Sequence, residues 1–67
     1  MNTQLLKSKI VENGETQAQL ALAIGVSASN LNDKINCKVA FRQDDIAAIR
    51  KHYHLTPEDV DLIFFAS

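Results

Sequence analysis

The side chains with the chemistry of metal ligands or nucleophiles are few, and they include Cys37, His52 and His54. These three are too few for a closed zinc site, which takes four nitrogen or sulfur ligands. The sequence also lacks a glycine-rich phosphate loop, paired carboxylates in an apolar setting and a nucleophile with a recognisable base. It therefore predicts a protein that is not an enzyme, with no metal, no cofactor and no small-molecule substrate.

The charges are unevenly distributed along the 67 residues. The formal net charge is -1, which is unusual for a protein that binds DNA unaided. Basic residues gather between Lys34 and His52, whereas the last twelve residues carry Glu58, Asp59 and Asp61 and nothing basic. The chain thus has a basic middle and an acidic end, so nucleic acid stays a candidate partner for the middle segment.

The single cysteine is typical of a protein in a reducing compartment. The first ten residues, MNTQLLKSKI, lack the pattern of a secretory signal. The longest apolar run, Leu62 to Ala66, is far shorter than the ~20 residues of a membrane-spanning helix. We therefore expect a cytoplasmic protein that does not enter a membrane.

Apolar residues recur at steps of three and four, and strand-like alternation is absent, which predicts an all-α fold. We expect a single domain over residues 1–67, with helices near Thr3–Asn13, Thr16–Ile24, Ser27–Asn36 and Gln43–Tyr53 and a fifth that starts at Thr56. The helical spacing predicts a core of Leu6, Ile10, Leu20, Ile24, Leu31, Ile35, Ile46 and Ile49.

The second and third predicted helices are linked by Gly25-Val26-Ser27 alone. Gly25 ends one helix in the left-handed conformation, and the Ser27 hydroxyl caps the next. Helices joined by so short a turn cross steeply, and small residues are expected where they meet. Ala21 and Gly25 meet that need, while Val26, Leu31 and Ile35 fill the wedge between the helices.

In this segment the chain resembles the phage repressor and Cro type, the Xre-like family of helix-turn-helix proteins. The resemblance rests on Gln17, Ala21, Gly25, Val26, Ser27 and Leu31 and spans roughly Leu6 to Phe65. The stretch NCKVAFRQDDI and the short tail with two phenylalanines are similar to small Cro-like and modulator-of-repression proteins of temperate phages. The resemblance implies a lambda-repressor-like fold and a role in regulating transcription at a lysogeny or lysis switch.

The resemblance also implies which residues face DNA, because the helix after the turn lies in the major groove in this family. The base-reading candidates are Ala28, Ser29, Asn32 and Asp33. The phosphate candidates are Gln17, Asn30, Lys34 and Lys38. The chain departs from the family pattern where Asn36-Cys37 replaces a common glycine, so Asn36 is expected to take the left-handed turn. The reading helix also carries Asp33 and no arginine.

The tail suggests a second interpretation. From Val60 to Phe65 the apolar residues point nearly all round a helix, so some of them must lie at the surface. Leu62, Phe64 and Phe65 are the candidates for an interface. The alternative function is a modulator that docks on a partner repressor and does not bind DNA by itself, and a homodimer is a further possibility.

Overall fold

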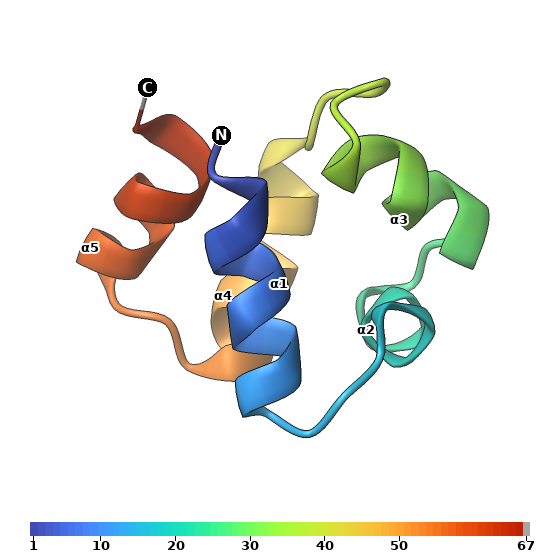
Figure 1. Cartoon of the computed structure of the whole chain (residues 1–67), viewed down its shortest axis with the longest axis horizontal. Helices are drawn as coiled ribbons and strands as arrows, with labels where there is room; N and C mark the ends of the chain where they lie inside the picture. Colours follow the sequence, from blue (N-terminus) through green and yellow to red (C-terminus); the bar gives the residue numbers. More distant parts are fainter. Residues whose placement is uncertain (67) are drawn as a thin grey trace.

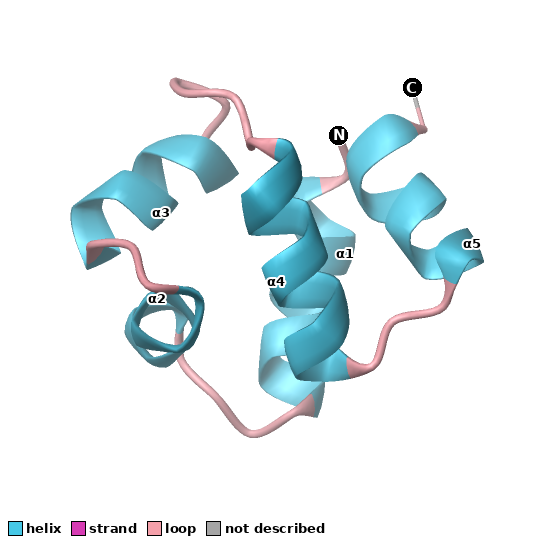
Figure 2. Ribbon diagram, turned by 180° about the vertical axis from the view of Figure 1, so that it is seen from behind, coloured by secondary structure: helices cyan, strands magenta, loops and turns pink. Residues whose placement is uncertain are grey.

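Five α-helices and a closing π-helical turn make up the regular structure of residues 1–66, the part of the chain that the computed structural model describes (Figures 1 and 2). The elements are α1 (Thr3–Glu12), α2 (Gln17–Ile24), α3 (Ala28–Ile35), α4 (Gln43–Tyr53), α5 (Pro57–Val60) and η1 (Asp61–Phe65). No strand occurs within these residues, so the predicted all-α class is confirmed. None of these helices is long and apolar enough to cross a membrane.

Side-chain caps explain where the helices begin. The hydroxyl of Thr16 accepts from the backbone N–H of Gln19 at 3.2 Å, and the Gln19 side chain accepts from the N–H of Thr16 at 2.8 Å. Ser27 caps α3 through the N–H of Asn30, at 3.0 Å. Asn2 and Thr56 cap α1 and α5 in the same way. Each cap satisfies a backbone donor that has no partner inside its helix, so the predicted helix starts at Thr16, Ser27 and Thr56 are confirmed, and the Asn2 cap of α1 is a further finding.

The end of α3 differs from the prediction. Asn36 has φ -84°, and the left-handed residue is Cys37, with φ +62°. The turn is closed by the N–H of Cys37, which donates to the Lys34 carbonyl at 3.1 Å, and by the N–H of Lys38, which donates to the Asp33 carbonyl at 2.8 Å. Asparagine tolerates a positive φ better than cysteine does, but these two hydrogen bonds place the reversal one residue later.

The core lies around α1 and α4. Figure 2 shows α4 in front of α1, with α2 and α3 on one side and α5 on the other. Ile24 and Ile46 are only partly buried, and the other six predicted core residues are buried. The core of the described residues is Leu6, Ile10, Leu20, Ala21, Leu31, Ile35, Ile49, Tyr53, Leu55 and Ile63.

Candidate functional site

The two helices on one side of the core, α2 and α3, cross steeply. In Figures 1 and 2, α2 is seen nearly end-on while α3 runs across the view. Leu20 and Leu31 are fully buried, and Ala21 is 1% exposed. The small Ala21 side chain therefore lies in the closed interior near this crossing, as the sequence predicts.

Gly25 has a different role from the one expected. Its φ of +79° confirms the left-handed end of α2. A Cβ atom built at this position meets no atom within 4 Å, however, so the helices do not need a glycine there to approach each other. The expectation of steric crowding at Gly25 is therefore corrected, and the backbone conformation alone accounts for this glycine.

The outward face of α3 presents small neutral side chains. Ala28, Ser29 and Asn32 are exposed, whereas Asp33 is half-buried. The Gln17 side-chain amide donates to Oδ1 of Asn32 at 3.1 Å, across 15 residues of sequence. The first residue of α2 therefore orients a side chain on the exposed face of α3. The sequence analysis placed both residues at the site but did not foresee that they bond to each other.

Asn30 lies differently from its neighbours. It is half-buried, and its Oδ1 atom is shielded from solvent without a hydrogen-bond partner. It lines a hollow between α3 and the loop before α4, together with Lys34 and Arg42. Its Oδ1 atom therefore does not face solvent, unlike the exposed side chains of Ser29 and Asn32, and its contact with a phosphate stays a prediction.

Lys34 does not reach the surface. It is 4% exposed, and its Nζ atom lies 2.5 Å from Oδ2 of Asp45. The same oxygen accepts from the backbone N–H of Arg42 at 2.9 Å. Burial acts to raise the pKa of Asp45, but Lys34 and the Arg42 N–H outweigh burial and lower that pKa below its usual value. The Lys34 ammonium is thus engaged inside the protein, which corrects its assignment to a phosphate.

Two cations remain exposed in the loop that follows α3. Lys38 is one, as predicted, and Arg42 at the start of α4 is the other. Arg42 belongs to the basic segment of the sequence but is not among the predicted phosphate contacts. From Thr16 to Asn32 there is no Asp, Glu, Lys, Arg or His at all. The exposed side chains from Thr16 to Asn32 are therefore neutral, the half-buried Asp33 follows them on α3, and the exposed cations Lys38 and Arg42 lie beyond the end of α3.

The tail candidates separate into buried and exposed side chains. Phe64 is half-buried and packs edge-to-face on Phe41, with ring centroids 5.2 Å apart. Leu62 and Phe65 expose 47% and 65% of their surface. The expected fifth helix changes at Asp61 from an α-helix to a π-helical turn. Because a π-turn is wider than an α-turn, it turns adjacent side chains to directions that an α-helix would not give.

Elsewhere in the described part of the chain, the titratable residues make separate contacts. Residues 1–66 contain no group of three His, Cys, Asp or Glu side chains that could hold a metal ion. Nε2 of His52 lies 2.9 Å from Oε1 of Glu15 and joins the end of α4 to the loop before α2. The neighbouring Tyr53 hydroxyl and the His52 ring favour the ionised carboxylate and lower the pKa of Glu15. This hydrogen bond joins two elements and is a structural contact.

Comparison with known proteins gives a family match without an activity. A family model described as "Protein of unknown function (DUF739)" matches residues 2–67. No curated protein matches the chain, and no solved structure matches it.

Proposed function

Because the chain belongs to the DUF739 family, whose description names no activity, we propose from its geometry that it is a helix-turn-helix regulator of transcription. The observation that carries this proposal is the α2–α3 pair. The two helices cross steeply through a glycine turn, and the Gln17 amide holds Asn32 on the exposed face of α3. Two such helices, the second with small polar side chains outward, suit insertion into a DNA groove.

In the proposed complex α3 enters the major groove. Ser29 and Asn32 would form hydrogen bonds with base edges, and the Ala28 methyl group would touch a thymine methyl. Asp33 would have to accept from a cytosine amino group, because a carboxylate is repelled by phosphates. Gln17 and Lys38 would contact phosphates, and Arg42 joins them in place of Lys34. The proposed setting is the cytoplasm, at a phage lysogeny switch, and no enzymatic activity is proposed.

The charge distribution favours a second candidate function. Phosphate contacts supply most of the non-specific affinity of a DNA-binding protein, and the neutral α2–α3 face offers few of them. A chain with net charge -1 that keeps the shape of a repressor suits docking on a basic repressor. In this second proposal the chain modulates a partner repressor and does not bind DNA by itself.

Selection from a random double-stranded DNA library at low salt tests the first proposal. We expect the purified chain to enrich one sequence motif, and Asn32→Ala to lose the preference at one base pair while still enriching the rest. Val11→Ser is the matched control, because Val11 is exposed on α1, outside the α2–α3 pair. Failure to enrich any motif would reject autonomous binding and favour the modulator.

A further inference from the structure

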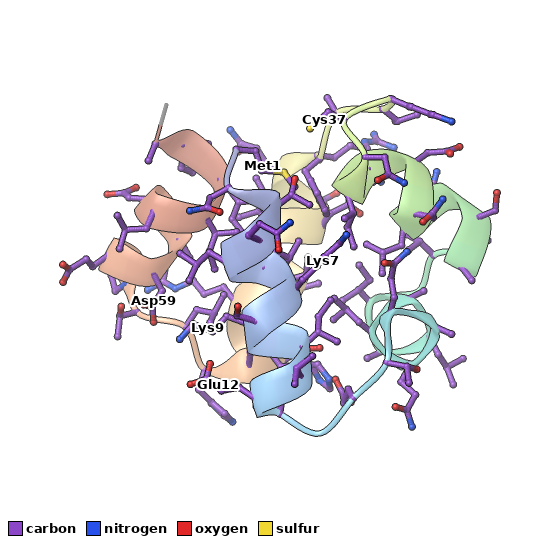
Figure 3. All side chains as sticks on the ribbon, viewed as in Figure 1. Met1, Lys7, Lys9, Glu12, Cys37 and Asp59 are labelled. Atoms are coloured by element: carbon purple, nitrogen blue, oxygen red, sulfur yellow. The ribbon has the colours of Figure 1, made fainter. Side chains whose placement is uncertain are left out.

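The most exposed aromatic ring of the described residues is Phe65, and it stands between two hollows. One hollow, of about 310 Å³, is lined by Gln43, Ile46, Ala47, Arg50, Val60 and Phe65 itself. The other hollow, of about 320 Å³, is lined by Phe65 together with Met1 and Cys37. Figure 3 labels Met1 and Cys37. A projecting ring thus has empty apolar space on both sides.

Phe65 is held in place although it is exposed. The residue two before it, Ile63, is fully buried, and the Ile63 carbonyl accepts from the backbone N–H of Asn2 at 2.6 Å. The Phe64 ring is anchored on Phe41. The N–H of Ala66 donates to the Asp61 carbonyl at 2.7 Å, which closes the turn around Phe65. The backbone that carries Phe65 is therefore already ordered, so binding costs only the freedom of the ring's own side-chain torsions, and the ring suits the centre of an interface.

Arg50 in the lining of the first hollow and the exposed carboxylates of the tail carry charges of opposite sign. Arg50 is the charged residue of its lining, and no ion pair within residues 1–66 includes it. Asp61 is exposed and comes directly after Val60, which lines the hollow, and the exposed Glu58 comes three residues before Asp61. The tail segment Pro57–Phe65 therefore carries carboxylates and exposed apolar side chains, which are the groups that a hollow lined by Arg50, Ile46 and Ala47 would receive.

The projecting Phe65 ring lines the same hollow as Arg50, and the exposed Asp61 comes directly after Val60 of that lining. We propose that this surface, which we call the Phe65 surface (Ile46, Ala47, Arg50, Val60, Asp61 and Phe65), is the interface between two copies of the chain. A two-fold contact requires a patch that is complementary to itself. Phe65 of each copy enters the hollow of the other, and Arg50 of each copy faces Asp61 of the other. The contact exists twice by symmetry.

This interface is independent of the proposed DNA contact. Figures 1 and 2 place α5 and α3 on opposite sides of α1 and α4, so a second copy at the Phe65 surface leaves the outward face of α3 open. A failed test of the interface therefore leaves the DNA proposal standing, and a chain that fails to bind DNA can still dimerise.

Sedimentation of the full chain over a concentration series tests the interface. We expect wild type to change from monomer to dimer as concentration rises, and Phe65→Ser to weaken that association by about tenfold or more. Val11→Ser removes an exposed apolar side chain from α1, outside the Phe65 surface, and should leave the association unchanged. A wild-type monomer at all concentrations, or a dimer unaffected by Phe65→Ser, would overturn the proposal and assign the surface to another protein or to none.

Charge exchange tests the arrangement of the two copies. Arg50→Glu and Asp61→Arg should each prevent dimerisation alone, because each places like charges opposite each other twice. Mixed together, the two variants should form a heterodimer, since both cross-contacts are then of opposite sign. Mass spectrometry of the intact mixture identifies this species, and circular dichroism confirms that each variant is folded. If the mixture stays monomeric while wild type dimerises, the Arg50–Asp61 arrangement is wrong.

Discussion

Lys34 and Asp45 form a buried ion pair that joins α3 to the first turn of α4. The Nζ and Oδ2 atoms are 2.5 Å apart, and the two residues expose 4% and 8% of their surface. Since the same carboxylate caps α4 through the Arg42 N–H, one side chain fixes both the start of α4 and its position against α3. The proposed reading helix is therefore held against α4 by the buried Lys34 ammonium, a group that is usually exposed to solvent.

Removing the positive member of this pair should destabilise the fold strongly. Lys34→Met keeps most of the volume but leaves the buried Asp45 carboxylate without its cationic partner, with only the Arg42 N–H still bonded to it, which costs about 3–5 kcal/mol. Urea denaturation measures the loss. Lys38→Met, at an exposed position in the same segment, should change the free energy of unfolding by less than about 0.5 kcal/mol. Lys34→Met/Asp45→Asn should recover part of the loss, and equal effects of Lys34→Met and Lys38→Met would contradict the buried pair.

The same pair predicts how stability depends on pH. The pKa of Asp45 is lowered in the folded chain from its ordinary 3.8, so the folded state favours the ionised carboxylate. The resulting stabilisation is complete above the ordinary pKa and is lost as the pH falls through the lower, folded-state pKa. The melting temperature should therefore decrease when the pH is lowered below about 4. The melting temperature of Lys34→Met/Asp45→Asn should decrease less steeply with falling pH than that of wild type. Parallel pH profiles for wild type and this variant would exclude Asp45 as a source of the acid sensitivity.

The helix ends were predictable from sequence because their causes are local. Thr16 with Gln19, Gly25 and Ser27 act on backbone groups within a few residues, so the letters alone locate α2 and α3. The Lys34–Asp45 and Gln17–Asn32 contacts were not predictable in this way. They join residues 11 and 15 positions apart whose side chains look like ordinary solvated groups until the helices are packed.

The tail shows a different limit of the sequence. An apolar run predicts that some side chains are exposed, but it does not say which. Phe64 packs on Phe41 while Phe65 stays exposed. The chain changes from α5 to the π-turn η1 at Asp61, and no residue type in that stretch signals the change.

Substitutions at Gly25 should separate conformation from crowding. Gly25→Ala forces an alanine into φ +79°, which costs about 1–2 kcal/mol, and Gly25→Asn should cost less because asparagine tolerates this region. Gly14 has φ +69° and also has open space around it, so Gly14→Ala should lose a similar amount. Thermal or urea unfolding compares the three variants. A loss at Gly25 several times that at Gly14 would show that the helix crossing itself requires a glycine.

The proposed DNA contact predicts a shallow dependence on salt. Each phosphate that a cation neutralises adds about -0.9 to the slope of log K against log salt concentration. Because Lys34 is engaged by Asp45, the exposed cations of the loop after α3 are Lys38 and Arg42, and the slope should be about -2 for each bound copy. Fluorescence anisotropy with a selected operator, titrated at several salt concentrations, measures this slope.

Substitutions of the two lysines then identify which cation contacts a phosphate. Lys38→Ala should make the slope shallower by about 1, whereas Lys34→Met/Asp45→Asn, which removes the buried charges together, should leave it unchanged. The opposite result, with Lys38 silent and the slope reduced in the double variant, would mean that Lys34 leaves Asp45 to reach a phosphate. That outcome would require α3 to be repositioned when DNA binds, since the ion pair that orients it would then be open.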